Sequence, residues 1–182
     1  MKKISKSGCE GILCAGFGGQ GIMFMGKLLA EAGLLAGKRV TWMPSYGAEV
    51  RGGTAYSMTK ISKEAIASPI VTSPDVLIAM NKPSLVKYEA NVRPGGLLIY
   101  NKTLVDVLPK RKDVKIIGVP MTELASKLGN TRCANMIALG VFLKRSKAVS
   151  IRYAVNALKA ALKNREDLFA LNKKALEKGY SL

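Results

Sequence analysis

The chain has no histidine, and that absence excludes several kinds of chemistry at once. None of its 182 residues carries an imidazole, so a histidine base, a histidine metal ligand and a Ser-His-Asp triad are all excluded. Cysteine is scarce too. The three thiols, Cys9, Cys14 and Cys133, have no metal-ligand spacing. We expect reduced thiols, with Cys14 and Cys133 buried as small apolar side chains.

Acidic and aromatic residues are also few. Twelve acidic residues against 29 basic ones give a net charge of +17, which favours an acidic partner such as nucleic acid, an anionic cofactor or an acidic protein surface. A nucleic-acid binder would lose affinity steeply as salt rises. With 6% aromatics, no interleaving and no known motif, we predict no nucleic-acid partner. The lysine-rich runs 110–115, 144–147 and 173–178 are equally typical of solvated helix faces.

Long apolar runs are missing. The longest clean run, MIALGVFL at residues 136–143, is far shorter than the roughly 20 residues that a membrane-spanning helix needs. Gly8, Glu10 and Gly11 interrupt any apolar region of a signal peptide. We therefore expect a cytoplasmic protein with no membrane contact.

What the sequence does contain is an alternation of short apolar runs with helical patterns. This alternation predicts βαβ units and a mostly parallel central sheet. We expect one three-layer α/β domain over residues 1–182, with a helical C-terminal segment from about 121 to 182. Pro44 is expected to end the second strand, and Gly37 to end the first helix. The expected strands are 11–15, 39–43, 54–61, 75–80, 97–100 and 114–119, and the expected helices are 22–35, 83–91, 122–128, 131–143, 151–162 and 167–178.

The first candidate site is the turn GFGGQG, between the first strand and the first helix. Gly16, Gly18 and Gly21 have the G-x-G-x-x-G spacing. In this context the turn favours a bound phosphate, although close packing without a ligand explains the same glycines. A nicotinamide site needs a carboxylate about 20 residues further on. The sequence there, VTWMPSYG, offers none before Glu49, so a stand-alone dinucleotide-binding redox protein is only an alternative.

The second candidate site is PSYGAEVRGGT, residues 44–54. We expect it at the carboxyl end of the second strand, beside the glycine turn, where ligands and partners dock on open α/β sheets. It combines an aromatic hydroxyl, a carboxylate, a guanidinium and three glycines. Glu49 and Arg51 could instead pair with each other on a solvated loop. Asn81 and Asn101 end strands at the same edge, where helix-start and turn chemistry also explains them.

Together and in this order, GFGGQGI and PSYGAEVRGGT resemble the gamma subunit of the 2-oxoacid:ferredoxin oxidoreductases. The likeness is greatest to the 2-oxoglutarate and branched-chain 2-oxoacid members. It extends through SPIVTSPDVLIAMNKPSL and RPGGLLIYN, covers about residues 10–145, and includes the C-terminal helices in general character. An indolepyruvate-type subunit shares the glycine turn and remains an alternative.

The resemblance implies a multi-subunit enzyme that converts a 2-oxoacid, coenzyme A and oxidised ferredoxin into acyl-CoA, carbon dioxide and reduced ferredoxin. It implies alpha, beta and delta-type partner subunits that hold thiamine diphosphate, Mg and iron–sulfur clusters, and ferredoxin binding through the complex. The chain itself has no G-D-G…N thiamine motif and too few cysteines for a cubane cluster. We expect it to hold no cofactor, metal or catalytic residue, and to be inert alone. In isolation it is expected to associate with itself, as a homodimer, or with an acidic partner, through contacts that salt weakens.

The expected role of the two motifs is to pack against the catalytic subunits and help close their site from water. A second hypothesis is that the basic surface attracts the phosphates of coenzyme A. The residues expected at this subunit interface or ligand edge are Gly16, Gly18, Gly19, Gln20, Gly21, Ser45, Tyr46, Gly47, Glu49, Arg51, Gly52, Gly53 and Asn81.

Overall fold

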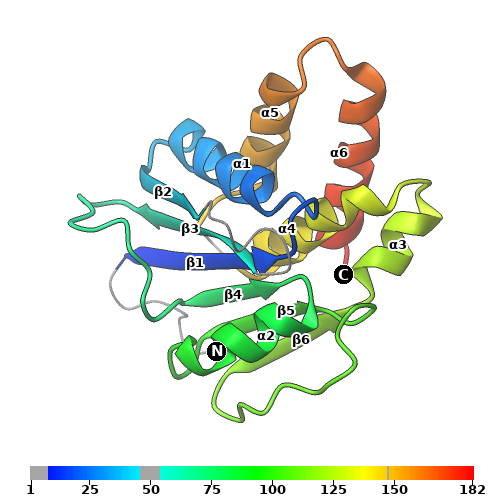
Figure 1. Cartoon of the computed structure of the whole chain (residues 1–182). Coiled ribbons are helices and arrows are strands. Elements are labelled where there is room, and N and C mark those ends of the chain that lie inside the picture. The colour runs from blue at the N-terminus through cyan, green and yellow to red at the C-terminus, as the bar shows by residue number, and fades with distance from the viewer. Residues whose placement is uncertain (1–7, 46–53, 147) are drawn as a thin grey trace.

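A computed structural model of the chain describes residues 8–45, 54–146 and 148–182. Its centre is a six-stranded sheet in the order β2-β3-β1-β4-β5-β6 (Figure 1). The pairs β1–β4, β4–β5 and β5–β6 are parallel, whereas β3 is antiparallel to both of its neighbours. The mostly parallel sheet is therefore confirmed. The strands are β1 (Cys9–Gly16), β2 (Arg39–Ser45), β3 (Ala55–Ser62), β4 (Val76–Ala79), β5 (Leu97–Asn101) and β6 (Lys115–Val119).

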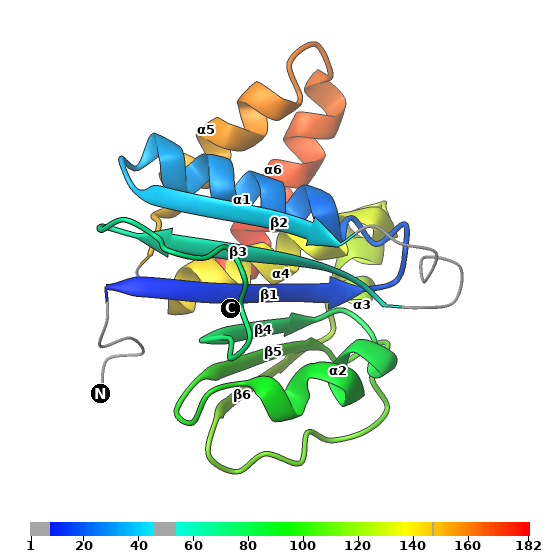
Figure 2. The ribbon, with the colours of Figure 1, turned by 60° about the vertical axis from the view of Figure 1, so that its left-hand side comes forward.

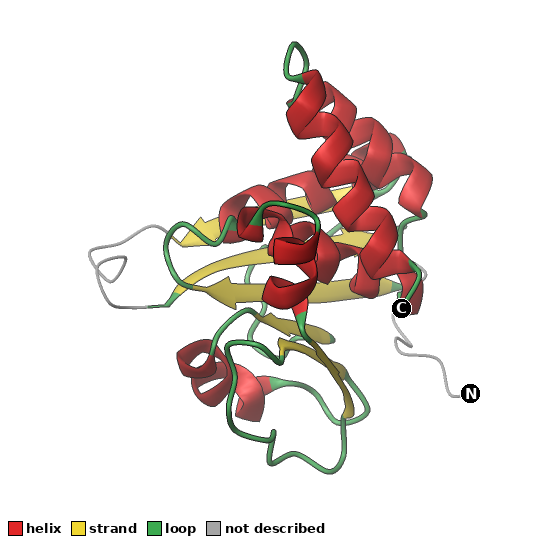
Figure 3. Ribbon diagram, turned by 90° about the vertical axis from the view of Figure 1, so that its right-hand side faces the viewer, coloured by secondary structure: helices red, strands yellow, loops and turns green. Residues whose placement is uncertain are grey.

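Helices cover both faces of the sheet. Side chains alternate along a strand, so in β1 Ile12 and Cys14 enter the core under α1 and α4, and Leu13 and Ala15 enter the smaller core under α2. Figure 3 shows most of the helices gathered on one side of the sheet. The helices are α1 (Ile22–Leu35), α2 (Lys82–Tyr88), α3 (Met121–Lys127), α4 (Ala134–Arg145), α5 (Ile151–Ala161) and α6 (Glu166–Tyr180), with short 3-10 turns η2 (Glu89–Asn91) and η3 (Thr131–Cys133).

The helical C-terminal segment is also confirmed, and its last two helices form an arm. α5 packs on α1 and α6 packs on α4, and both extend away from the sheet (Figure 2). In the parts of the chain that the structure describes, no helix is both long and apolar enough to cross a lipid bilayer.

The two expected stop signals behave differently. Gly37 ends α1 as predicted: its φ is +69°, and the N–H groups of Gly37 and Lys38 donate to the carbonyls of Leu34 and Gly33. The prediction that Pro44 ends the second strand is wrong, because β2 continues to Ser45. Proline is tolerated there because β2 is an edge strand, where the missing N–H removes no bond from the sheet interior.

The chain order makes a switch point between β1 and β4. From β1 the chain crosses through α1 towards β2, and from β4 it continues through α2 towards β5 on the opposite side. α1 and α2 therefore cover opposite faces, and the carboxyl ends of β1 and β4 border the crevice where open α/β sheets bind ligands.

Candidate functional site at the carboxyl edge of the sheet

The glycine turn after β1 is shaped by close packing. A Cβ at Gly16 would lie 2.6 Å from Oε1 of Gln20, and one at Gly21 would lie 2.2 Å from Nδ2 of Asn135 on α4. Gly19 and Gly21 also have φ values of +87° and +70°, a backbone conformation that favours glycine. Gly18 is exposed. Close packing therefore explains Gly16 and Gly21, and the backbone conformation explains Gly19, whereas neither accounts for Gly18.

Gln20 joins the glycine turn to the end of β4. Its Oε1 accepts from the backbone N–H of Phe17 at 2.7 Å and from Nδ2 of Asn81 at 3.3 Å. Its Nε2 donates to the carbonyl of Met80 at 3.4 Å. One side chain thus ties the two strand ends of the switch point together and fixes the shape of this edge.

Asn81 has mainly a structural task. It is 1% exposed and is the N-cap of α2, where its Oδ1 accepts from the N–H of Ser84 at 2.9 Å. Asn101 is equally buried and donates to Oγ1 of Thr122 at 2.7 Å. The helix-start interpretation is confirmed for Asn81, which also contacts Gln20 of the candidate site.

The second motif is described only at its ends. Ser45 ends β2, and Thr54 precedes Ala55, which pairs with Gly16 of the glycine turn. Both ends of the segment therefore lie at the carboxyl edge, as the sequence predicts for the motif as a whole. The remaining predicted residues, Tyr46, Gly47, Glu49, Arg51, Gly52 and Gly53, lie outside the described residues.

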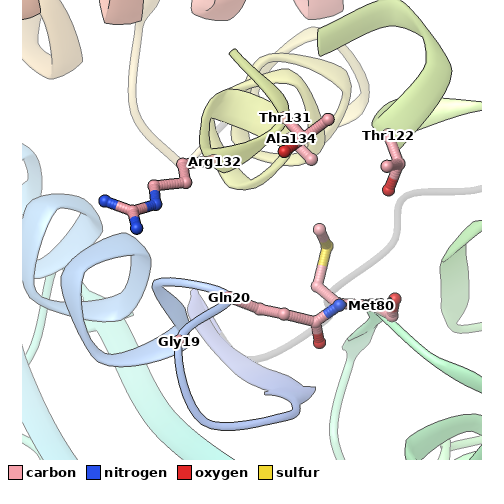
Figure 4. A pocket seen from close by; sticks show the side chains of 7 residues that line it. All are labelled: Gly19, Gln20, Met80, Thr122, Thr131, Arg132 and Ala134. Atoms are coloured by element: carbon pink, nitrogen blue, oxygen red, sulfur yellow. Dashed lines mark hydrogen bonds between the residues drawn. The ribbon is translucent and has the colours of Figure 1, made fainter. Parts of the chain in front are cut away.

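A hollow of about 170 Å³ opens beside the turn, and we call it the edge hollow. Gln20 borders it from the glycine turn, and Arg132 extends from the opposite side, where η3 leads into α4 (Figure 4). Sequence reasoning missed Arg132, because it follows an irregular return from α3 that no periodicity predicts. The place of Thr122 at this edge was predictable from the sequence, because Thr122 closely follows β6 and parallel strands end at one edge. The lining residues are Gly19, Gln20, Met80, Thr122, Thr131, Arg132 and Ala134.

The electrostatics of the edge hollow suit an anion. Arg132 is the charged residue among its described lining residues, which include no carboxylate. α1 begins directly after the turn with no acidic residue in its first turn, so its N-terminal N–H groups and dipole favour negative charge. Hydroxyls of Thr122 and Thr131 add neutral donors.

Reactive groups do not gather at this edge. Burial raises the pKa of the Cys14 thiol to about 12, and burial also raises the pKa of Cys133, which makes both poor nucleophiles. Their predicted burial is confirmed. Across residues 8–45, 54–146 and 148–182, no three Cys, Asp or Glu side chains are grouped to hold a metal ion. The described residues of this site can bind and position, but they offer no means of breaking a bond.

These features define a class of protein: an open α/β fold with a switch point between β1 and β4 and a hollow at the carboxyl edge of its sheet. Within that class the family is clear. The chain belongs to the pyruvate ferredoxin/flavodoxin oxidoreductase family, which it matches over residues 11–182. The membership predicted from the two motifs is confirmed.

Two curated relatives differ in how much of their own length this chain matches. VorA, a ketoisovalerate oxidoreductase subunit of Methanothermobacter marburgensis, is 38% identical over 166 residues, which cover 91% of this chain but 34% of VorA. The chain thus spans about a third of the length of that relative. KorC, a 2-oxoglutarate synthase subunit of the same organism, is 36% identical over 156 residues, covering 81% of this chain and 83% of KorC.

Solved structures agree with the fold. The gamma subunit of a keto/oxoacid ferredoxin oxidoreductase from Geobacter sulfurreducens superposes with a TM-score of 0.83 at 30% identity, over 94% of this chain and 96% of that one. A 2-oxoglutarate:ferredoxin oxidoreductase from Magnetococcus marinus, determined with 2-oxoglutarate, coenzyme A and succinyl-CoA bound, gives a TM-score of 0.88 at 27% identity. It is matched over 97% of this chain and 31% of the other.

Proposed function

We propose that this chain is the gamma subunit of a multi-subunit 2-oxoacid:ferredoxin oxidoreductase and works in the cytoplasm. The observation that supports it best is the edge at the β1/β4 switch point. There Gln20 fixes the glycine turn against β4, and the described residues provide no reactive group. An edge whose described residues are held by hydrogen bonds and carry no reactive group suits a subunit that completes a site whose chemistry belongs to other chains.

The partners follow from this role. Thiamine diphosphate, Mg and iron–sulfur clusters belong to alpha, beta and delta-type subunits, and coenzyme A is a co-substrate of the complex. This chain contributes the glycine turn and residues 45–54 as a contact surface, and it helps to exclude water from the neighbouring site. Exclusion of water matters because a carbanion formed by decarboxylation must transfer electrons rather than take up a proton.

Variants of the assembled complex test this role. We expect Glu49→Ala and Arg51→Ala to weaken assembly or to lower turnover with a 2-oxoacid and coenzyme A. Lys63→Ala is the matched control, because Lys63 is exposed and follows β3 at the opposite, amino edge of the sheet. Unchanged assembly and turnover in both edge variants would remove the contact surface from the proposal.

The isolated chain offers an independent test. On its own it should show no 2-oxoacid oxidation and no stoichiometric flavin, nicotinamide or iron. An absorbance spectrum with a flavin or cluster band would favour a stand-alone redox protein instead. Neighbouring genes for a thiamine-type beta chain and a small eight-cysteine chain would agree with the complex.

A second candidate function is supported by the edge hollow. Arg132, two threonines and the glycine turn that precedes α1 line a hollow of about 170 Å³, and the related Magnetococcus enzyme was determined with coenzyme A bound. On this hypothesis the chain holds a phosphate of coenzyme A. Arg132→Ala should then raise the KM for coenzyme A and leave kcat nearly unchanged. An equal fall in kcat with an unaltered KM would contradict it.

A further inference from the structure

The arm carries a basic stripe on α5 that the edge of the sheet does not use. Arg152, Asn156, Lys159 and Lys163 follow one another at steps of four, three and four residues, so they share one side of the helix. All four are exposed. Lys163 lies just beyond α5, where the N–H of Leu162 still donates to the carbonyl of Leu158. We call these four residues the α5 stripe.

The opposite side of α5 fixes the direction in which the stripe points. Ala154, Ala157 and Leu158 are fully buried, and α5 packs on α1. Because this apolar side is anchored in the core, the helix cannot rotate to hide its cations. The stripe borders a shallow, open depression of about 380 Å³, whose lining residues, Asn156, Lys159, Ala160 and Lys163, all come from α5 and the turn that ends it.

Among the described residues no ion pair involves the stripe; the acidic residues that follow it most closely in the sequence are Glu166 and Asp167, in the first turn of α6. α5 contains no Asp or Glu, and neither Lys159 nor Lys163 has an acidic partner among the described residues. Arg152 contacts its neighbour Tyr153, with its guanidinium carbon 5.2 Å from the ring centroid. Ion pairs elsewhere among the described residues include Lys27–Glu31, Lys82–Asp106, Arg93–Asp75, Arg111–Asp113, Lys127–Glu123 and Lys173–Glu177.

We propose that the α5 stripe is a docking surface for an acidic helix of a protein partner. The stripe is about 16 Å long, from eleven residue steps at 1.5 Å each, which matches about three turns of a helix with carboxylates at i, i+4, i+7 and i+11. Because the side chain of Ala160 is small, it leaves room for a second helix to approach the stripe closely. The amide of Asn156 both donates and accepts, which suits a polar side chain between the charges.

A nucleic acid fits the stripe less well. Three cations neutralise at most three phosphates, which gives weak and salt-sensitive binding. The stripe itself has no aromatic side chain on which bases could stack. The docking surface goes beyond the proposed function and does not depend on it, because it lies on the arm and not at the edge hollow.

The test uses the full chain and two synthetic helical peptides of identical composition. One peptide has four Glu residues at i, i+4, i+7 and i+11 on an Ala- and Gln-rich background, and the other distributes the same four Glu residues around the helix. We expect the one-sided peptide to bind about tenfold more tightly, since exposed ion pairs are individually weak and act together only when aligned. Fluorescence anisotropy at low and high salt measures both affinities.

Two triple variants with the same change of net charge separate the stripe from overall charge. R152E/K159E/K163E should abolish the preference for the one-sided peptide. K102E/K112E/K115E, which changes exposed lysines near β5 and β6, should retain it. R152Q/K159Q/K163Q repeats the test with a milder change, and circular dichroism checks that each variant is folded.

Three results would overturn the proposal. The first is equal affinity for the two peptides, and the second is equal loss in both charge-reversal variants. The third comes from a competition experiment in which duplex DNA or phosphatidylserine vesicles displace the labelled one-sided peptide. If they do so at a lower concentration of negative charge than the unlabelled peptide needs, a nucleic acid or a membrane is favoured. None of these measurements involves oxoacid turnover, so failure here leaves the proposed function untouched.

Discussion

At the contact between α4 and α6, helix propensity and packing predict opposite changes in the free energy of unfolding when a glycine is replaced by alanine. Gly140 and Gly179 lie inside these helices. A Cβ at Gly140 would lie 2.1 Å from the carbonyl oxygen of Leu176, and a Cβ at Gly179 would lie 2.0 Å from that of Ile137. Both obstacles are backbone atoms, which cannot rotate away. An added methyl group must therefore push the helices apart by roughly an ångström.

The free energy of unfolding should fall. Alanine in place of a helical glycine stabilises a free helix by about 1 kcal/mol, so helix propensity alone predicts a more stable protein. Separation of the helices unpacks the contact around Ala175 and Leu176, which are fully buried, and overpacking of this kind costs about 3 kcal/mol at the upper end of the usual range. The net loss of about 2 kcal/mol corresponds to a Tm lower by about 4–8 °C for a chain of this size.

Thermal unfolding followed by circular dichroism measures the effect on Gly140→Ala and Gly179→Ala. Gly33→Ala is the control: Gly33 is buried in α1, but its added Cβ would meet Cγ2 of Val40 at 2.8 Å, a side chain that can turn aside. The control should change Tm by about 2 °C or less. If Gly140→Ala raises Tm, the close approach of α4 and α6 is wrong.

Three further predictions concern single polar residues. Burial raises the pKa of Glu10, which accepts from Ser146 Oγ at 2.5 Å. A raised pKa makes its contribution to stability largest at low pH and lost as pH rises through the folded pKa, so the Tm of wild type relative to Glu10→Gln should increase in calorimetry as the pH falls from 7 towards the ordinary pKa of 4.5. Asn81→Ala removes the α2 cap and should cost about 1 kcal/mol in urea unfolding, whereas Asn81→Asp should retain most of it. Arg111 donates to the carbonyls of Glu89, Ala90 and Val92, in and just after η2, and its guanidinium pairs with Asp113. Arg111→Ala should therefore speed proteolysis within residues 102–113, measured by mass spectrometry against Lys112→Ala.

Much of the fold was predictable because the local patterns agree with the tertiary structure. The nearly continuous apolar run at residues 75–80 became β4, buried on both faces as expected of a parallel strand. The strongly apolar run at 131–143 became η3 and α4, nearly all of it buried. Partial alternation at 54–61 correctly predicted a strand, and its buried and half-buried residues alternate along most of β3.

The site was only partly predictable, because its contacts join distant segments. The spacing of Gly16 and Gly21 located the turn, but the role of Gln20 depends on Met80 and Asn81, about 60 residues further along the chain. Arg132 reaches the edge hollow only because α3 and η3 return the chain to the switch point. Long-range returns of this kind leave no periodic signal in a sequence.

The direction of β3 explains why both described ends of the second motif lie at the same edge as the glycine turn. β2 runs parallel to β1, so Ser45 lies at the carboxyl edge. If the next strand were also parallel, the chain would have to leave this edge through a crossover and start β3 at the opposite one. Because β3 is antiparallel and inserted between β2 and β1, it starts at the carboxyl edge, with Ala55 opposite Gly16. The antiparallel insertion is thus the topological reason that Ser45 and Thr54, the described ends of the second motif, lie at the same edge as the glycine turn.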